Sequence, residues 1–268
     1  MKPFTPTLKH GLAAALLCVA ATASHAADLL DTVKQAGVLK IALEGTYPPF
    51  DYRNAEGQLE GFDVDVAKAV AARLGVKPQF VTTEWSGILA GLQAGKFDVI
   101  VNQVAITPSR QQALDFSMPY VFSSAQLLQR RNDTRAFKSL DELKGKKVGV
   151  TMGSNYVDLV KTVPAIDLQV YPGTPENLRD LAAGRIDAAV NDRLMLSYLI
   201  KNSHLPLRPG SVLAGGEDRM GIPFRKGNPK FKQAIDKALD DIKRDGTYAK
   251  VSTRWFERDV SKPPAAAR

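Results

Sequence analysis

The feature of this sequence that most restricts its fold is a repeated alternation of short apolar runs with amphipathic segments. The runs at 38–45 and 77–83 are typical of strands, and the segment 62–75 between them is typical of a helix that ends at glycine. A second helix is predicted at 85–96 and a further strand at 97–104. Strands that alternate with helices in this way predict an α/β fold with a largely parallel sheet.

The same alternation starts again in the middle of the chain. It predicts strands at 146–153, 168–173 and 186–192, and helices at 139–145, 154–163 and 174–185. A strand at 218–227 and two helices within 228–256, divided at Gly246, complete the pattern. Two sheets of this kind indicate two lobes with a cleft between them, and such clefts are preferred sites for small molecules.

The N-terminal segment 1–26 differs from the rest of the chain. It carries Lys2 and Lys9, then a short apolar run, then the small residues of the "SHA" sequence. We predict a secretory signal peptide that is cut after Ala26. A membrane anchor would need about 20 apolar residues, and polar residues interrupt this run too early.

Removal of this segment leaves few groups for metal or thiol chemistry. Cys18 lies within the segment, so the mature chain has no cysteine, and His204 is then its only histidine. We therefore expect no disulfide, no thiol nucleophile, and no cofactor or metal. Loss of Lys2 and Lys9 lowers the formal charge from +8 to +6, and the remaining Lys and Arg are scattered among acids. A nucleic-acid partner is not expected from this distribution.

Two predicted loops carry aromatic residues. In "EGTYPPFDY", Glu44 lies at the end of a strand and Tyr47 precedes two prolines that hold the backbone extended. Tyr47 can face a ligand or pack in the core, whereas we assign Phe50 to the core. Trp85 stands at the start of a helix. Tyr47 and Trp85 can sandwich a ligand, with core packing as the alternative for Trp85.

The stretch "NQVAITPSRQQALDF" places an arginine at the start of a helix. Thr107 is a suitable N-cap, and Pro108 falls at the first helical position. Arg110 then lies in the first turn, where the helix dipole disfavours a cation. The placement is explained if a carboxylate or phosphate binds to Arg110 and the helix amides together. A surface ion pair with Asp115 is the alternative.

The second half of the chain has corresponding polar positions. Gly153, Ser154 and Asn155 lie between a predicted strand and a helix, which is another place for an anion. Asp192 ends an apolar strand, where an unpaired carboxylate is costly to bury. Arg110 on one lobe and Asp192 on the other would hold the two charges of an α-amino acid. An N-cap role for Asp192 is the alternative.

The sequence resembles the polar-amino-acid family of periplasmic solute-binding proteins, which serve ABC importers. The match runs in order from about Leu30 to Phe256. The fragments that carry it are "EGTYPPFDY", "GQLEGFDVDVAKAVAARLG", "ITPSRQQALDFSMPY", "LKGKKVGVTMGSNY", "GRIDAAVNDRL" and "RKGNPKFKQAIDKALDDIKRDGTYAKVSTRWF". The resemblance implies a type II two-lobe fold with two hinge strands and the ligand in the cleft. Residues 27–124 and 217–268 would form the first lobe, and residues 125–216 the second.

The resemblance also implies roles at the amino-acid head group. Arg110 would bind the α-carboxylate and Asp192 the α-ammonium group. Ser154 and Asn155 would offer amides or side chains to the carboxylate, and Gln103 would present its carbonyl to the ammonium group.

Other implied roles concern the rest of the ligand. Tyr47 and Trp85 would flank it, while Glu44 and Asn102 would reach its distal half, where Glu44 would face a distal ammonium group. Ala105 is a departure, because family members commonly have Thr or Ser there. Its backbone N–H can still donate, but the lost side-chain hydrogen bond would cost about 0.5–1.5 kcal/mol.

Several of these fragments, "LEGTYPPF", "NQVAI", "GSNY" and "DRL", look most like cystine-binding members. We therefore predict a monomeric periplasmic protein that binds L-cystine by hinge closure, delivers it to membrane permease subunits, and is not an enzyme. One alternative is a binder of arginine, lysine, histidine or glutamine. Another is a periplasmic enzyme on the same fold, such as a cyclohexadienyl dehydratase, with Glu44 or Asp192 as general acid.

Overall fold

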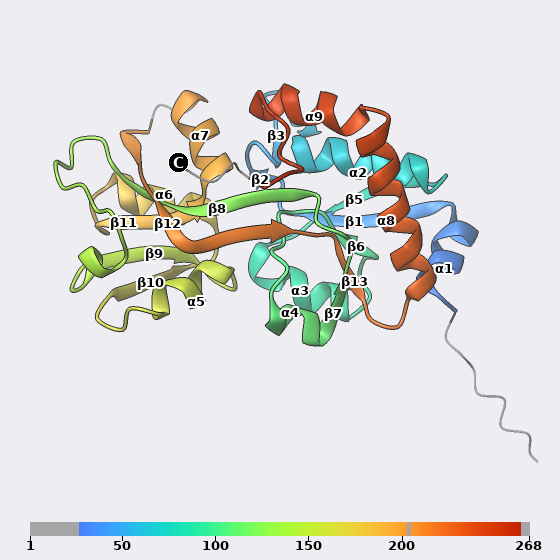
Figure 1. The fold of residues 1–268 in the computed structure, drawn as a ribbon, viewed down its shortest axis with the longest axis horizontal. Helices are drawn as coiled ribbons and strands as arrows, with labels where there is room; N and C mark the ends of the chain where they lie inside the picture. Colours follow the sequence, from blue (N-terminus) through green and yellow to red (C-terminus); the bar gives the residue numbers. More distant parts are fainter. Residues whose placement is uncertain (1–26, 203–204, 264–268) are drawn as a thin grey trace, which may run out of the picture.

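The computed structural model describes residues 27–202 and 205–263. The chain forms two α/β lobes, each built on a five-stranded sheet (Figure 1). The predicted signal peptide, 1–26, and His204 lie outside the described residues. No helix in the described ranges is long and apolar enough to cross a membrane.

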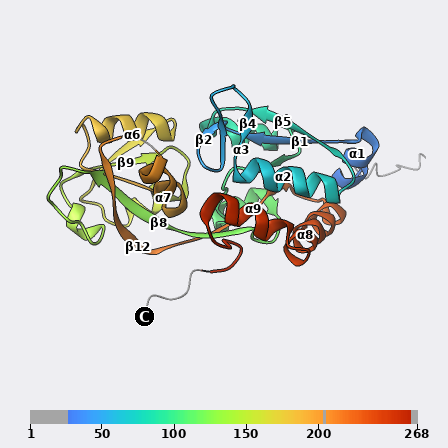
Figure 2. The same cartoon turned by 90° about the horizontal axis from the view of Figure 1, so that it is seen from above.

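The first lobe contains the sheet β5-β1-β6-β13-β7. Its strands are β1 (Val38–Leu43), β5 (Lys77–Thr82), β6 (Val99–Ile100), β7 (Leu114–Phe116) and β13 (Pro223–Arg225). The helices of this lobe are α1 (Leu29–Ala36), α2 (Phe62–Arg73), α3 (Trp85–Gln93), α4 (Pro108–Ala113), α8 (Pro229–Arg244) and α9 (Thr247–Phe256). A small sheet of β2 (Thr46–Tyr47), β3 (Asp51–Arg53) and β4 (Leu59–Glu60) lies on the side of this lobe that faces the second lobe (Figure 2).

The second lobe contains the sheet β10-β9-β11-β8-β12. Its strands are β8 (Val121–Arg130), β9 (Lys147–Thr151), β10 (Asp167–Tyr171), β11 (Ala188–Asp192) and β12 (Leu207–Met220). Three helices, α5 (Asn155–Lys161), α6 (Thr174–Ala182) and α7 (Arg193–Asn202), and the 3₁₀ turn Asp141–Leu143 complete it.

Helix α8 shows how the sequence pattern produces this packing. Phe231, Ile235, Leu239 and Ile242 recur every three or four residues, and all four side chains are buried. Burial of each such side chain contributes about 1.5–3 kcal/mol. The helix ends before Gly246, whose φ of 82° breaks the run and starts α9, as the sequence predicted.

The two long strands β8 and β12 pair antiparallel and run between the lobes (Figures 1 and 2). Ser124 is the register partner of Glu217, and Val121 that of Met220. The chain thus leaves the first sheet, enters the second through β8, and returns through β12. The lobe boundaries given above remain predictions.

The predicted α/β fold with two lobes is confirmed, but the sheets are mixed rather than largely parallel. Among the described strands, β1 pairs in parallel with β5 and β6, and β9 with β10 and β11. The pairings of β8 with β11 and β12, and of β13 with β6 and β7, are antiparallel. The strand expected at 97–104 is limited to the two residues of β6. Gln103, which follows β6, has a φ of 50°, which lies outside the range of β-strands.

Candidate functional site

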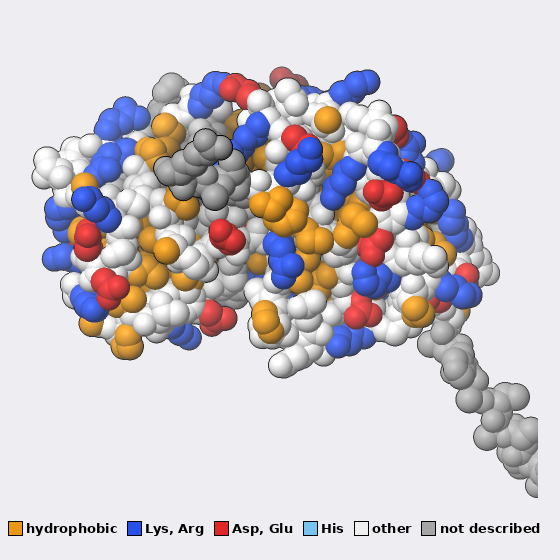
Figure 3. Space-filling model, in the orientation of Figure 1, with side chains coloured by type: hydrophobic (Ala, Val, Ile, Leu, Met, Phe, Trp, Pro, Cys, Tyr) orange, Lys and Arg blue, Asp and Glu red, His pale blue; other side chains and the backbone are white. Residues whose placement is uncertain are grey.

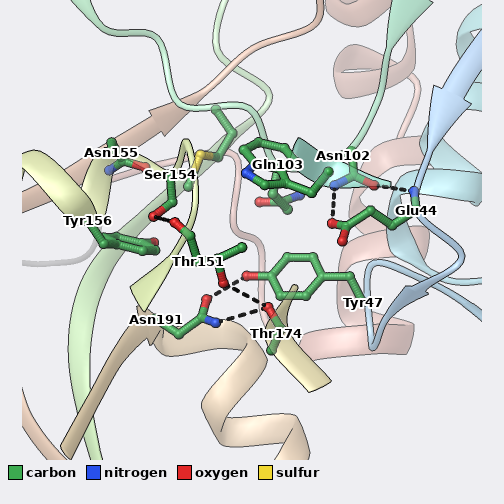
Figure 4. A pocket seen from close by; sticks show the side chains of 12 residues that line it. Glu44, Tyr47, Asn102, Gln103, Thr151, Ser154, Asn155, Tyr156, Thr174 and Asn191 are labelled. Carbon is green, nitrogen blue, oxygen red and sulfur yellow. Dashed lines mark hydrogen bonds between the residues drawn. The ribbon is translucent and has the colours of Figure 1, made fainter. Parts of the chain in front are cut away.

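A cavity lies between the two lobes, at the ends of strands from both sheets (Figure 4). Its lining comprises Glu44, Tyr47, Trp85, Asn102, Gln103, Thr151, Ser154, Asn155, Tyr156, Thr174, Asn191 and Met220. Seven of these are residues that the sequence singled out. Ala105, Arg110 and Asp192, which it also singled out, do not line the cavity.

Tyr47 connects the lobes across the cavity. The side chain is 8% exposed, and its hydroxyl donates a hydrogen bond to Asn191 Oδ1 at 2.8 Å. Asn191 Oδ1 also accepts from the backbone N–H of Asp192 at 2.8 Å. Because Tyr47 belongs to the first lobe and Asn191 to β11 of the second, the lobes are in direct contact here.

Arg110 makes a second contact between the lobes. Its Nη1 donates to Ala105 O at 2.8 Å and its Nη2 to Gly153 O at 2.9 Å, and the guanidinium lies over the Trp85 ring, 5.7 Å from the centroid. Within the described ranges Arg110 forms no ion pair, so the alternative pairing with Asp115 is absent. Two of its five N–H groups are used, and three remain for a ligand.

The start of α4 is as the sequence predicted, but the helix is short. Thr107 Oγ1 accepts from the backbone N–H of Arg110 at 3.3 Å, and Pro108 is the first residue of a six-residue helix. So short a helix sums few peptide dipoles, and the unfavourable field inferred at Arg110 is correspondingly small. Burial lowers the pKa of Arg110, and the nearby Asp218 carboxylate opposes this effect.

The backbone of Ala105 is arranged to donate a hydrogen bond. Ala105 and Met220 form an isolated antiparallel β-bridge. The two hydrogen bonds of this bridge are made by the neighbouring residues: Ile106 N–H donates to Arg219 O, and Gly221 N–H donates to Val104 O. The N–H and C=O of Ala105 therefore point away from the neighbouring strand. The carbonyl accepts from Arg110, while the N–H has no acceptor among the described residues.

Glu44 and Asn102 form a pair at the first-lobe side of the cavity. The backbone N–H of Glu44 donates to Asn102 Oδ1 at 2.8 Å, and Asn102 Nδ2 donates to Glu44 Oε2 at 2.9 Å. Burial raises the pKa of Glu44 to about 7, which outweighs the lowering by the Asn102 hydrogen bond. Glu44 is thus balanced between its acid and carboxylate forms near neutral pH, and an adjacent cation would favour the carboxylate.

Gln103 donates two hydrogen bonds to the buried carboxyl group of Asp63. Its backbone N–H donates to Asp63 Oδ2 at 3.0 Å and its Nε2 to Asp63 Oδ1 at 2.8 Å. Burial raises the pKa of Asp63 to about 7, although hydrogen bonds from Tyr120 and Gln103 lower it in part. The side-chain Oε1 of Gln103 is buried without a hydrogen-bond partner in the part of the chain described, so it is an available acceptor.

The two predicted donors of the second lobe already have partners. Ser154 precedes α5, and its Oγ donates to Thr151 O at 2.7 Å. Asn155 Nδ2 donates to Asp218 Oδ1 at 2.7 Å. Both residues line the cavity, but a ligand would have to share or replace these bonds.

Asp192 adopts the N-cap arrangement that the sequence allowed as its alternative role. Its side chain is 1% exposed, and Oδ1 accepts from the backbone N–H of Leu194 in the first turn of α7 at 2.7 Å. Burial raises the pKa of Asp192 to about 6, and the Ser123 side chain and backbone amides of α7 offset part of this effect. Its predicted contact with an ammonium group remains a proposal.

Sequence reasoning missed several residues at this site: Thr151, Tyr156, Thr174, Asn191, Met220 and the adjacent Asp218. Thr151, Tyr156 and Asn191 lie within the quoted fragments "LKGKKVGVTMGSNY" and "GRIDAAVNDRL", but they were not singled out as site residues. Met220 and Asp218 lie on β12, whose partner strand is distant in sequence, and no local pattern marks them.

Comparison with known proteins places this fold and cleft in a family. The family described as bacterial extracellular solute-binding proteins, family 3, matches residues 39–258. The chain belongs to this family.

Relatives and solved structures agree with that assignment. The L-cystine-binding protein TcyJ of Escherichia coli K12 is 40% identical, over 87% of this chain and 88% of that protein. The L-cystine-binding protein TcyA of Bacillus subtilis 168 is 36% identical, over 88% and 87%. An ancestral arginine-binding protein solved with arginine has a TM-score of 0.77 and 37% identity, covering 82% of this chain and 98% of that one.

These findings confirm the family and fold that the sequence resemblance implied. The chain is a solute-binding protein of this family rather than an enzyme, and its relatives TcyJ and TcyA are named as L-cystine-binding proteins. The relatives differ in the amino acid that they bind, so the family alone does not decide the ligand.

Proposed function

We propose that this protein binds L-cystine in the interlobe cleft and delivers it to the permease subunits of an importer. The observation that carries the proposal is that each lobe brings an acid to the part of the cavity that Tyr47 crosses. Glu44 lines the first-lobe side, and Asp192 follows Asn191, the second-lobe residue that accepts the Tyr47 hydroxyl hydrogen bond. We propose that a ligand along Tyr47 places an ammonium group near each acid, and L-cystine carries an ammonium group at each end.

The α-carboxylate is assigned to the Arg110 side of the cleft. Arg110 keeps three N–H groups that no residue described here occupies, and the Ala105 N–H is close by since Arg110 binds the Ala105 carbonyl. Charge-assisted hydrogen bonds to a carboxylate contribute about 1.5–3 kcal/mol each. Ser154 and Asn155 stand next to Gly153, the other partner of Arg110, and would complete this contact.

The remainder of the ligand is assigned to the first-lobe side. Tyr47 and Trp85 provide flat apolar surface on which the disulfide and methylene groups would pack. Glu44 and Asn102 would hold the distal amino-acid group, and Gln103 Oε1 would accept a further hydrogen bond.

Closure of the lobes would follow from contacts on both sides of the ligand. Arg110 and Glu44 belong to the first lobe and Asp192 to the second, so a ligand bound to all three favours the closed state over the open one. The family assignment supports a periplasmic location, with 1–26 as the signal peptide, and we propose that the protein acts as a monomer.

A second candidate ligand is arginine or another cationic amino acid. Glu44 would pair with the cationic side chain, and an ancestral relative of similar fold was solved with arginine. A thermal-shift screen of the proteinogenic amino acids and L-cystine tests both candidates, because a ligand raises the melting temperature with its concentration relative to Kd. We expect the largest shift with L-cystine. A larger shift with arginine at equal concentration would overturn the cystine assignment, and no shift with any amino acid would overturn the binding role.

A further inference from the structure

The second-lobe end of the two hinge strands holds three buried oxygen atoms that lack a well-formed hydrogen bond within the described residues. They are Ser123 Oγ, Asp192 Oδ2 and Asp218 Oδ2. The three residues are only 2%, 1% and 7% exposed. A buried polar atom without a partner costs about 1–3 kcal/mol, and more when it is charged. The Ser123 hydroxyl has one donor, which the adjacent Asp192 carboxylate can accept, so the two carboxyl groups together still lack donors.

The strand register brings the three side chains to one face of the sheet. Asp218 on β12 is the register partner of Ser123 on β8. Asp192 on β11 is the register partner of Ala125, which lies two residues from Ser123 on the same strand. Because alternate residues of a strand share a face, both acids flank the Ser123 hydroxyl. This group of three is called the hinge niche below.

The hinge niche adjoins the cavity. Asn155, which lines the cavity, donates to Asp218 Oδ1 at 2.7 Å, and Asn191, which also lines it, precedes Asp192. The groups that face Asp218 are Asp192 from β11, Tyr156 and Asn155 from α5, and Arg110 from α4. Arg110 thus faces Asp218, whereas Arg193 and Arg258 interact with Asp192. Burial and the Asp192 charge raise the pKa of Asp218 to about 7.

We propose that Asp218 is a second carboxylate for the α-ammonium group of the ligand, acting with Asp192 and Ser123. A primary ammonium group has three N–H donors, and the hinge niche offers Asp192 Oδ2, Asp218 Oδ2 and the lone pairs of Ser123 Oγ as acceptors. The α-carboxylate of the same ligand would lie on Arg110, the cation that faces Asp218. The hinge niche then selects primary α-amines over N-acylated or hydroxy-acid analogues, which cannot supply three donors.

This inference rests on the proposed amino-acid binding, and Asp218→Asn tests it. Asparagine keeps an oxygen acceptor for Asn155 Nδ2 but removes the charge. Calorimetric titrations at pH 7.5 use L-cystine and L-arginine. For whichever of the two the wild type binds, we expect the variant to bind about 10- to 100-fold more weakly than the wild type. Glu217→Gln is the matched control, since Glu217 is exposed and adjacent residues of a strand face opposite sides. It should stay within about twofold of wild type.

Proton release separates ammonium binding from a merely structural role. Titrations at pH 6.5 in buffers of different ionisation enthalpy give the number of protons released. An ammonium group that enters the hinge niche drives protons from Asp192 and Asp218, so Asp218→Asn should release fewer than wild type. Wild-type affinity and proton release in Asp218→Asn would overturn this inference alone. Failure of the wild type to bind either amino acid would instead overturn the proposed function. If Asp218→Asn does not fold, Ser123→Ala takes its place, with an expected affinity loss of about two- to tenfold. This variant is judged by affinity alone, and wild-type affinity would overturn the inference.

Discussion

The hydroxyl of Tyr47 on the first lobe donates a 2.8 Å hydrogen bond to Asn191 on the second, so the two lobes are joined directly across the cleft. Tyr47→Phe removes this bond and keeps the ring. Asn191 Oδ1 retains the Asp192 N–H, so the loss should be that of one neutral hydrogen bond, about 0.5–1.5 kcal/mol. We expect ligand affinity to fall about two- to tenfold, mostly through faster dissociation in stopped-flow experiments. An unchanged dissociation rate would show that this bond does not help to hold the lobes closed.

Arg110 should be the most sensitive position in the cleft. Arg110→Ala removes the donors assigned to the α-carboxylate and the contacts with Ala105 and Gly153. We expect affinity to fall at least about 100-fold in calorimetric titrations. Arg131→Ala is a control of equal charge change, because Arg131 is exposed beyond the end of β8. Wild-type affinity in Arg110→Ala would remove the proposed carboxylate site.

Glu44 should determine whether a distal positive charge is preferred. Glu44→Gln keeps an oxygen for Asn102 Nδ2 but cannot carry charge. We expect affinity for L-cystine or L-arginine to fall about tenfold or more, while affinity for L-glutamine changes by less than about twofold. Equal losses for all three ligands in competition titrations would indicate that Glu44 only supports the loop.

Affinity should rise with pH. Burial is the main cause that raises the pKa of Glu44 and Asp218 to about 7 and of Asp192 to about 6, so these groups are largely neutral at pH 5.5. Ammonium groups bind their carboxylate forms, and we expect affinity to increase about tenfold or more between pH 5.5 and 7.5. Calorimetry across this range measures it, and affinity that does not change with pH would contradict the assignment of these acids to the ligand.

The same three acids make the unfolding free energy of the ligand-free protein fall as the pH rises, whereas they make ligand affinity rise. Their pKa values in the folded state lie above those of the unfolded chain, about 4, so their contribution to the unfolding free energy is greatest below pH 4. It is lost as the pH rises through about 7. The ligand-induced rise in melting temperature should therefore widen from pH 5.5 to 7.5.

The sequence predicted elements and site residues whose signals are local. The alternation of strands and helices located β1, α2, β5 and α3, and Glu44, Tyr47 and Trp85 were found because they end strands or begin helices. The scattered Lys and Arg predicted from the sequence are visible on one face of the molecule, where they alternate with acids (Figure 3).

Features that depend on distant pairing were not predicted from local patterns. The antiparallel pairing of β8 with β12 joins residues far apart in the chain, so neither the mixed sheets nor Asp218 could be inferred from periodicity. Arg110 was expected to need an anion, yet carbonyls of Ala105 and Gly153 satisfy part of its guanidinium. Gly153 belongs to the other lobe, and its approach depends on how the lobes meet.

The most direct test of the account is calorimetric titration of the purified, ligand-stripped protein with L-cystine at pH 7.5. We predict one binding site per chain, with tighter binding than for arginine, lysine, histidine or glutamine measured under the same conditions. Binding of arginine tighter than that of L-cystine would contradict the cystine assignment, and the absence of heat from every amino acid would contradict the binding site itself.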